Sequence, residues 1–199
     1  MALVWKWLQL RNFLMTTCLI SFGANIPGPL GCPAETLDRA IKEFQNHDLL
    51  ILKKSQIYSS LAFPNPKKPA YLNGCLQILV NCGPNDVLCK LKAIEKTMGR
   101  QTNRRWSSRI CDLDLLSFES KVLPSPEIFN HWYRMPLKNQ LLEKPDELLL
   151  PHPRIQDRAF VLKPLLDVAA DWIHPVHNLT VKEMFYFLPK EERDTVKEL

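Results

Sequence analysis

Two carboxylates separated by one residue, Asp112 and Asp114, lie in the segment CDLDLL. The segment alternates like a strand, so both carboxylates are expected on one face, with Cα atoms about 6.5–7 Å apart. Leu113 and Leu115 would then point into the core. Two carboxylates on one face suit Mg²⁺, which takes one or two protein oxygens and completes its shell with water and phosphate. The spacing therefore predicts a magnesium site.

Four arginines precede this pair without an intervening acid: Arg100, Arg104, Arg105 and Arg109. Guanidinium groups bind phosphate oxygens and stabilise the charge that develops during phosphoryl transfer. Taken alone, an arginine run is more often a solvated loop or a nucleic-acid patch, and a carboxylate pair is more often a solvated face. Together, with Trp106 between them, they point to a site for Mg·ATP. The Walker pattern and the glycine-rich loop of protein kinases are absent from the sequence, so such a site has another design.

A second polar group enters an expected helix. His152 lies between two prolines, and Arg154 and Arg158 follow it. The N-terminal amides of a helix favour anions, and these side chains would add to that preference. A histidine beside prolines is usually a loop residue, so this group is weak by itself.

A third group is aromatic. Tyr71 and Asn73, with Trp106 and Phe160 as partners, have the types that a flat heterocycle needs, because rings can sandwich it and an amide can read its edge. By spacing alone, aromatic residues such as these are more often part of the core.

Strands and helices that would position these residues follow one another irregularly, with short connections, which favours an α+β fold over a parallel sheet. The expected strands are 14–22, 49–60, 71–80 and 110–118, and the expected helices are 33–47, 85–98, 157–169 and a short one after Pro175. Asn85 or Asp86 can cap the second helix, and Gly99 can end it. In 71–80, alternation places Leu72, Gly74, Leu76, Ile78 and Val80 in the core, and Tyr71, Asn73, Cys75 and Gln77 on a more polar face.

A chain of 199 residues suits one domain. We expect a leader at 1–14, a domain at 15–189 with a proline-punctuated, irregular insertion at 121–148, and a charged, frayed C-terminal tail at 190–199. A signal anchor is an alternative for the leader. Against it, polar residues interrupt the apolar run, so it has no uncharged stretch of about 18 residues.

The net charge of +5 fits an anionic substrate as readily as nucleic acid. The six cysteines include no C-x₂-C pair. Most lie in apolar runs, where a reduced cysteine acts as a small hydrophobic residue. We therefore expect free thiols in a reducing compartment and a cytoplasmic protein.

In chain order, the motifs G-A-N (23–25), S-S (59–60), Y-L-N (71–73), G-R (99–100), R-W-x-x-R-x-x-D-L-D (105–114) and P-H-P-R-x-x-x-R-A-F-V-L-x-P-L (151–165) are present. This series resembles the 6-hydroxymethyl-7,8-dihydropterin pyrophosphokinase family, over residues 17–175. The resemblance implies a ferredoxin-like α+β sandwich with an antiparallel sheet and packed helices. It also implies an enzyme of folate biosynthesis that moves pyrophosphate from ATP to 6-hydroxymethyl-7,8-dihydropterin and releases AMP.

The same resemblance implies two Mg²⁺ ions between Asp112, Asp114 and the ATP phosphates. Catalytic roles would fall to Arg100, Arg109, Asp112 and Asp114; ATP would be bound by Arg105, His152 and Arg158; and the pterin by Tyr71, Asn73, Trp106 and Phe160. The expected partners are these two small molecules and a neighbouring folate-pathway enzyme, with no nucleic acid and no membrane span.

The sequence also departs from the family pattern. The loop between Ser60 and Tyr71 is short and lacks a Thr-x-Pro-x-Gly stretch, and an insertion precedes Pro151. One alternative is therefore a degenerate paralogue that binds nucleotide or pterin without turnover. A nucleic-acid module with Trp106 as a stacking residue is another, although it leaves the carboxylates beside the arginines unexplained. Residues 1–14 could also tether or target the chain.

Overall fold

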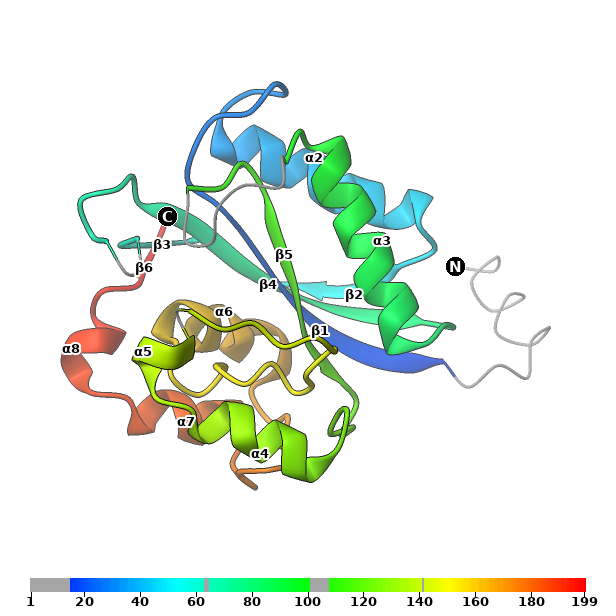
Figure 1. Ribbon diagram of the computed structural model, residues 1–199. Helices are drawn as coiled ribbons and strands as arrows, with labels where there is room; N and C mark the ends of the chain where they lie inside the picture. Colours follow the sequence, from blue (N-terminus) through cyan, green and yellow to red (C-terminus); the bar gives the residue numbers. More distant parts are fainter. Residues whose placement is uncertain (1–14, 63–64, 101–107, 141) are drawn as a thin grey trace.

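The computed structural model describes residues 15–62, 65–100, 108–140 and 142–199. In this part of the chain, one antiparallel sheet runs in the order β5-β1-β4-β3-β6, and β2 pairs with β4 beside β3 (Figure 1). The strands are β1 (Thr16–Ala24), β2 (Leu50–Lys54), β3 (Tyr58–Ser60), β4 (Tyr71–Val80), β5 (Asp112–Phe118) and β6 (Lys197–Glu198).

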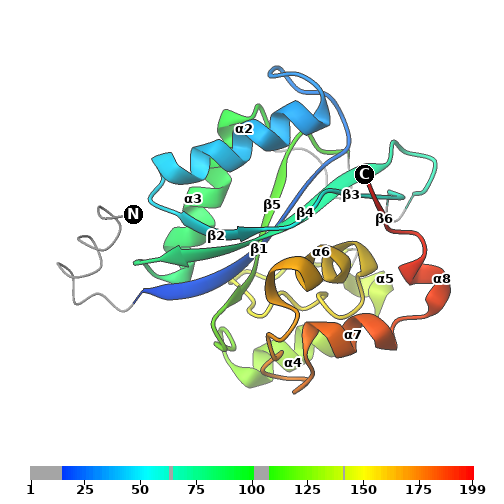
Figure 2. The same cartoon turned by 180° about the vertical axis from the view of Figure 1, so that it is seen from behind.

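Helices cover both faces of the sheet (Figures 1 and 2). One face carries α2 (Pro33–Asn46) and α3 (Pro84–Thr97). The opposite face carries α4 (Pro126–Arg134), α5 (Leu137–Gln140), α6 (Ala159–Ala169), α7 (Val181–Phe187) and α8 (Lys190–Arg193). The chain order of the first strands and helices is that of a ferredoxin-like fold, so the α+β prediction is confirmed. The second helical layer is an addition to the expected two-layer sandwich.

The strand alternation separates two apolar cores. Leu76, Ile78 and Val80 of β4 lie with Leu113 and Leu115 of β5 in the core under α2 and α3, as expected. On the other face, Cys75 is fully buried against α6 and α7. The expectation of a polar environment for Cys75 is therefore wrong, because the second layer of helices covers this part of the sheet.

Residues 49–60, expected as one strand, form the two strands β2 and β3. Ser55 lies in the break. Its backbone N–H donates to the carbonyl of Cys75 at 3.0 Å, and its Oγ accepts the N–H of Cys75 at 2.8 Å. A side-chain oxygen thus takes the place of a backbone acceptor, which interrupts the regular ladder between this segment and β4.

The helix boundaries follow the expected turn residues with one correction. Pro33 begins α2, and Gly99 follows α3 with φ of 90°, the left-handed conformation that glycine tolerates. The N-cap of α3 is Gly83 rather than Asn85 or Asp86. Asp86 instead accepts the backbone N–H of Gly83 at 3.3 Å from the first turn of the helix.

The insertion 121–148 contains α4 and α5, which corrects the expectation of an irregular segment. Ser125 caps α4 by accepting the N–H of Ile128 at 3.3 Å, and Pro126 occupies the first turn. Leu123 and Leu150 exchange backbone hydrogen bonds of 2.8 and 3.3 Å at the base of the insertion. Phe129 is fully buried, so α4 is anchored to the domain.

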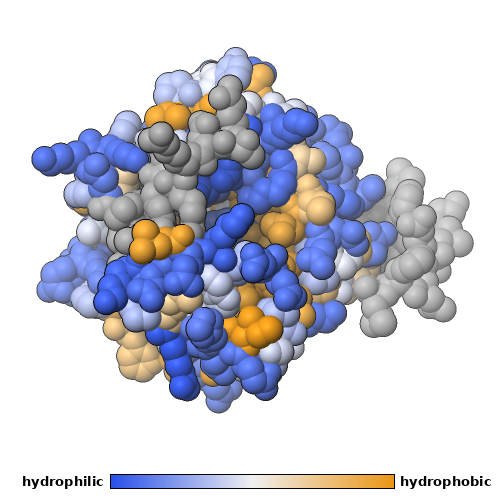
Figure 3. Space-filling view, viewed as in Figure 1, coloured by the Kyte–Doolittle hydropathy of each residue, from blue (hydrophilic) through white to orange (hydrophobic). Residues whose placement is uncertain are grey.

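The C-terminal residues also differ from the expectation. Residues 190–199 form α8 and β6 instead of a frayed tail. The predicted leader 1–14 lies outside the described residues. Among the helices of the described segments, none is long and apolar enough to cross a membrane. On the face seen in Figure 3, hydrophilic side chains predominate and apolar ones form separate small groups.

Candidate active site

A pocket of about 240 Å³ opens on the sheet face that carries the carboxylates. Eight residues singled out from the sequence line it: Tyr71, Asn73, Arg109, Asp112, Asp114, His152, Arg158 and Phe160. They come from β4, from β5 and the loop before it, and from the beginning of α6 and the segment that leads into it, so the fold brings the three predicted groups together. Arg104, Arg105 and Trp106 lie outside the described residues.

The floor of the pocket is β1. Gly23 is paired with Asn73 on one side and with Asp112 on the other. A Cβ atom at Gly23 would stand 3.4 Å from Oδ1 of Asn73. Glycine therefore leaves open the space between the amide of Asn73 and the carboxylate of Asp112. Ser21, two residues earlier, is paired with Asp114 in the same way.

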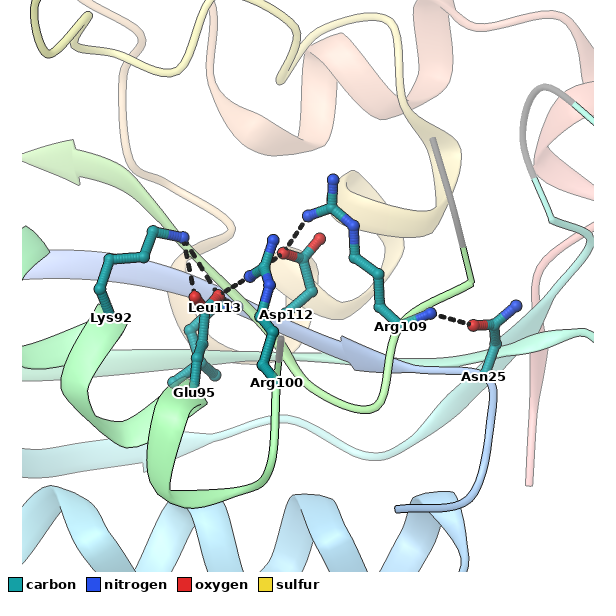
Figure 4. Close-up of polar contacts among 7 residues, drawn as sticks. All are labelled: Asn25, Lys92, Glu95, Arg100, Arg109, Asp112 and Leu113. Atoms are coloured by element: carbon teal, nitrogen blue, oxygen red, sulfur yellow. Dashed lines mark hydrogen bonds and ion pairs between the residues drawn. The ribbon is translucent and has the colours of Figure 1, made fainter. Parts of the chain in front are cut away.

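Asp112 is held by two arginines (Figure 4). Nη1 of Arg100 donates to Oδ1 of Asp112 at 2.8 Å, and Nη1 of Arg109 donates to the same oxygen. Because both arginines use Oδ1, Oδ2 is the remaining carboxylate oxygen of Asp112. Burial alone would lower the pKa of Arg109, but the charges of Asp112 and Asp114 outweigh it, and the net pKa is raised.

Glu95 of α3 is a site residue that sequence reasoning missed. It is only 2% exposed, yet it accepts from Nζ of Lys92 at 3.1 Å, from the backbone N–H of Leu113 at 2.7 Å and from Nη1 of Arg100. Burial raises its pKa, while Lys92, the N–H of Leu113 and Arg100 oppose this. Glu95 thus fixes Arg100 between two carboxylates and ties α3 to β5. In the sequence it is one acid on an expected helix, with no local signal of this role.

Arg158 lines the same pocket as Asp114. Burial lowers the pKa of Arg158, and the charge of Asp114 partly offsets the effect. The guanidinium carbon of Arg158 also lies 5.7 Å from the ring centroid of Phe160. Arg109 and Arg158 line the pocket together with the two carboxylates, so guanidinium groups lie where they can bind phosphate oxygens beside a metal held by the carboxylates.

His152 is a neutral hydrogen-bond donor in this arrangement. Its backbone N–H donates to the carbonyl of Leu116 at 2.8 Å, and its Nδ1 accepts the N–H of Arg154 at 3.1 Å. Burial, followed by the charge of Arg158, lowers the pKa of His152 to about 3. With Nδ1 used as an acceptor, the proton is assigned to Nε2, which can donate to a phosphate oxygen.

The amide of Asn73 is oriented by β3. Its Nδ2 donates to Oγ of Ser60 at 2.9 Å and to the carbonyl of Tyr58 at 3.5 Å. These contacts assign the amide nitrogen to the side of β3 and leave Oδ1 as an acceptor beside Gly23. Tyr71 and Phe160 form aromatic walls of the same pocket. This half of the site can hold a flat ring and read a donor at its edge.

Asn25, a second residue that we had not singled out for a role, joins two loops to the end of β1. Its Nδ2 donates to the carbonyl of Pro69 at 3.0 Å and to Oγ of Ser108 at 3.4 Å. Its Oδ1 accepts the N–H of Arg109 at 2.7 Å. One buried amide therefore positions the ends of the loops that precede Tyr71 and Asp112.

The residues present fit a magnesium ion that is bound together with phosphate. In the described segments, no group of three or more His, Cys, Asp or Glu side chains could hold a metal ion by itself. Mg²⁺ needs only one or two protein carboxylates when phosphate oxygens complete its shell. Asp112 and Asp114 line the pocket and supply this donor set, and Arg109 and Arg158 can bind the phosphates.

An antiparallel sheet in an α+β fold whose aromatic-walled pocket holds two carboxylates and two arginines fits one class of protein, a phosphotransferase for a polyphosphate and a flat acceptor. Comparison with known proteins then assigns the family. The family model described as 7,8-dihydro-6-hydroxymethylpterin-pyrophosphokinase (HPPK) matches residues 19–170. The chain belongs to this family, and the predictions of the family and of a pyrophosphokinase are confirmed.

Relatives and solved structures agree with this assignment. The 2-amino-4-hydroxy-6-hydroxymethyldihydropteridine pyrophosphokinases of Synechocystis and Aquifex aeolicus are 31% and 27% identical over 167 and 169 residues, which cover 83% and 85% of this chain and 73% and 90% of theirs. The folic acid synthesis protein of Pneumocystis carinii is 30% identical, but the match spans only 19% of its length. A crystal structure of Plasmodium falciparum HPPK-DHPS has a TM-score of 0.60 at 14% identity, covering 95% of this chain and 47% of that one, which shows the fold alone.

Proposed function

We propose that this chain transfers the pyrophosphate group of Mg·ATP to the hydroxymethyl oxygen of 6-hydroxymethyl-7,8-dihydropterin, a step of folate biosynthesis. The observation that carries the proposal is the convergence of a carboxylate pair, arginines, a neutral histidine and an aromatic-walled amide site in one pocket. The first half of this set suits a polyphosphate and the second half suits a flat, donor-rich ring.

In this proposal, Tyr71 and Phe160 hold the pterin between their rings, and Oδ1 of Asn73 accepts a hydrogen bond from its edge. Arg109, Arg158 and Nε2 of His152 bind phosphate oxygens of ATP. Arg100 acts behind them, because it is held between Glu95 and Asp112. We also propose ATP contacts for Arg105 and a closing role for Trp106, on the basis of the family resemblance.

The reaction is an in-line displacement at the β-phosphorus of ATP. The hydroxymethyl oxygen forms the new P–O bond, the bond between the β-phosphorus and the α–β bridging oxygen breaks, AMP leaves with that oxygen, and the hydroxyl proton passes to water. Two Mg²⁺ ions bound at Asp112 and Asp114 would neutralise phosphate charge. The residues contribute by orientation and by stabilising charge, in a site whose donors are already in place.

Partners and location belong to the same proposal. Several relatives are longer proteins, including the bifunctional folate synthesis protein of Arabidopsis thaliana, of which the match covers 23%. We propose a neighbouring folate-pathway enzyme as a partner of this chain. All six cysteines are free thiols, which supports a reducing, cytoplasmic setting.

The test is product analysis. Purified protein is incubated with ATP, Mg²⁺ and 6-hydroxymethyl-7,8-dihydropterin, and AMP and pterin pyrophosphate are separated by chromatography. We expect equimolar products that require the pterin and disappear when the metal is chelated. Arg158→Ala should lower the rate at least tenfold, because a charge-assisted phosphate contact is lost. The matched control is Arg39→Ala, because Arg39 is exposed on α2, on the side of the sheet opposite the pocket.

Other outcomes would reject the proposal in distinct ways. Pterin binding by folded wild-type protein without AMP formation would identify a paralogue without turnover. Salt-dependent binding to single-stranded nucleic acid that is unaffected by Asp112→Ala would support a nucleic-acid module instead.

A further inference from the structure

The C-terminal strand borders the half of the pocket that we assign to the pterin. β6 pairs antiparallel with β3, so that Lys197 lies opposite Ser59 and Glu198 lies opposite Tyr58. The backbone N–H of Leu199 extends this pairing by donating to the carbonyl of Ile57 at 3.1 Å. Figure 2 shows the C-terminus beside β3. The chain end therefore supports a strand that carries the pocket residue Ser60.

An apolar contact precedes β6. Val196 is 7% exposed and forms a small buried cluster with Tyr58 and Ala159, against which Phe160 and Leu188 pack. Ala159 and Phe160 are the first two residues of α6. The side chain of Val196 thus lies between β3 and the beginning of the helix that presents Phe160 to the pocket.

β3 in turn holds the amide of Asn73 by hydrogen bonds. The carbonyl of Tyr58 and Oγ of Ser60 both accept hydrogen bonds from Nδ2 of Asn73. The hydroxyl of Tyr58 donates to Asp167 of α6 at 2.9 Å. A shift of β3 would therefore move the amide of Asn73. It would also weaken the hydrogen bond between Tyr58 of β3 and Asp167 of α6.

We propose that Val196 and β6 are positioning elements for the pterin, which hold Phe160 at its face and Asn73 at its edge. These residues lie beyond 19–170, the part matched by the family model. The inference rests on the proposed function and adds a residue that acts through others. Asp112 and Asp114 lie on β5, at the opposite end of the strand order from β6, so the two carboxylates of the ATP half are supported separately.

The test is a comparison of kinetic constants in full-length protein. Val196→Ala removes the contact under Phe160 and should raise the KM for 6-hydroxymethyl-7,8-dihydropterin by about three- to tenfold, the worth of one aromatic stacking contact. The kcat should change less than about twofold, because the contacts in the transition state are retained once the pterin is bound. The KM for ATP should rise less than the KM for the pterin, because Asp112 and Asp114 lie on β5, away from β6. Deletion of 197–199, which removes β6 and the Leu199 contact, should have the same selective effect.

Val87→Ala is the matched control, because Val87 of α3 is fully buried in the other core, away from the pocket. It should lower the melting temperature and leave both KM values unchanged. Two results would overturn the inference while the proposed function stands. One is an unchanged KM for the pterin in folded Val196→Ala. The other is a rise of the KM for the pterin and of the KM for ATP that is as large in Val87→Ala as in Val196→Ala. Absence of pterin binding and turnover in wild-type protein would overturn both.

Discussion

The two carboxylates of the pocket should respond differently to the loss of their charge. Asp112→Asn replaces the carboxylate oxygen that accepts from Arg100 and Arg109 with a neutral amide oxygen, so both hydrogen bonds lose their ion-pair component. Each such change costs about 1 kcal/mol, and the three side chains are less than a third exposed, so we expect a loss of about 2–3 kcal/mol of unfolding free energy.

Asp114 carries no comparable ion pair in the described segments. Asp114→Asn removes repulsion from Asp112 together with attraction to Arg109 and Arg158, and these effects oppose each other. The unfolding free energy should therefore change by less than about 1 kcal/mol. Both substitutions remove an oxygen anion from the proposed metal site, which should lower kcat at least a hundredfold, or about 2.7 kcal/mol.

Urea unfolding at pH 7.5, followed by circular dichroism, gives the stabilities, and AMP formation gives the rates. Asp171→Asn, at an exposed position just beyond α6, is the control and should change neither. Equal destabilisation by Asp112→Asn and Asp114→Asn would refute the reasoning on stability. More than a tenth of the wild-type rate in either variant would refute the assignment of that carboxylate to the metal.

Three further predictions concern residues around the pocket. Glu95→Gln should lower the unfolding free energy by about 1–3 kcal/mol in urea and reduce kcat, because Arg100 loses its buried anchor; unchanged values would contradict this. Asn25→Ala should raise the KM for both substrates, because the ends of two loops are released; a change confined to one substrate would show that it serves only one loop. His174 is fully buried, and this burial, together with the neighbouring His177, lowers the pKa of His174 to about 3. Below about pH 6.5 the unfolded chain therefore binds more protons than the folded protein, and the unfolding free energy falls as the pH decreases. Between pH 7.5 and 5.0 in urea, His174→Asn should lose about 2 kcal/mol less than the wild type, and equal losses would count against this explanation.

Local sequence patterns predicted those strands and helices whose buried face follows from the spacing of apolar residues and whose ends follow from turn residues. Tyr71–Val80 forms β4 as expected, because apolar residues at every second position (Leu72, Leu76, Ile78 and Val80) line the face that packs on the core. The same rule put Leu113 and Leu115 inside, which leaves Asp112 and Asp114 on the pocket face. Pro33 and Gly99 mark helix ends through backbone preferences that act within one turn.

Contacts between distant segments were not predicted. Ser55 breaks 49–60 into two strands only because it meets Cys75. The chain end becomes β6 only because β3 offers a free edge. Neither signal is present within a window of a few residues, since both depend on which strand lies alongside.

The sequence by itself determined the residue types of the site and the side of the strand on which its carboxylates lie, since a period of two residues is a local property of the backbone. Only the tertiary structure decided which of the other groups meet them. His152, Arg158 and Phe160 reach the pocket through the packing of α6 on the sheet, and Glu95 reaches Arg100 through the packing of α3 on β5. Such contacts follow from the burial of two apolar cores on opposite faces of one sheet, a long-range effect that spacing along the chain does not encode.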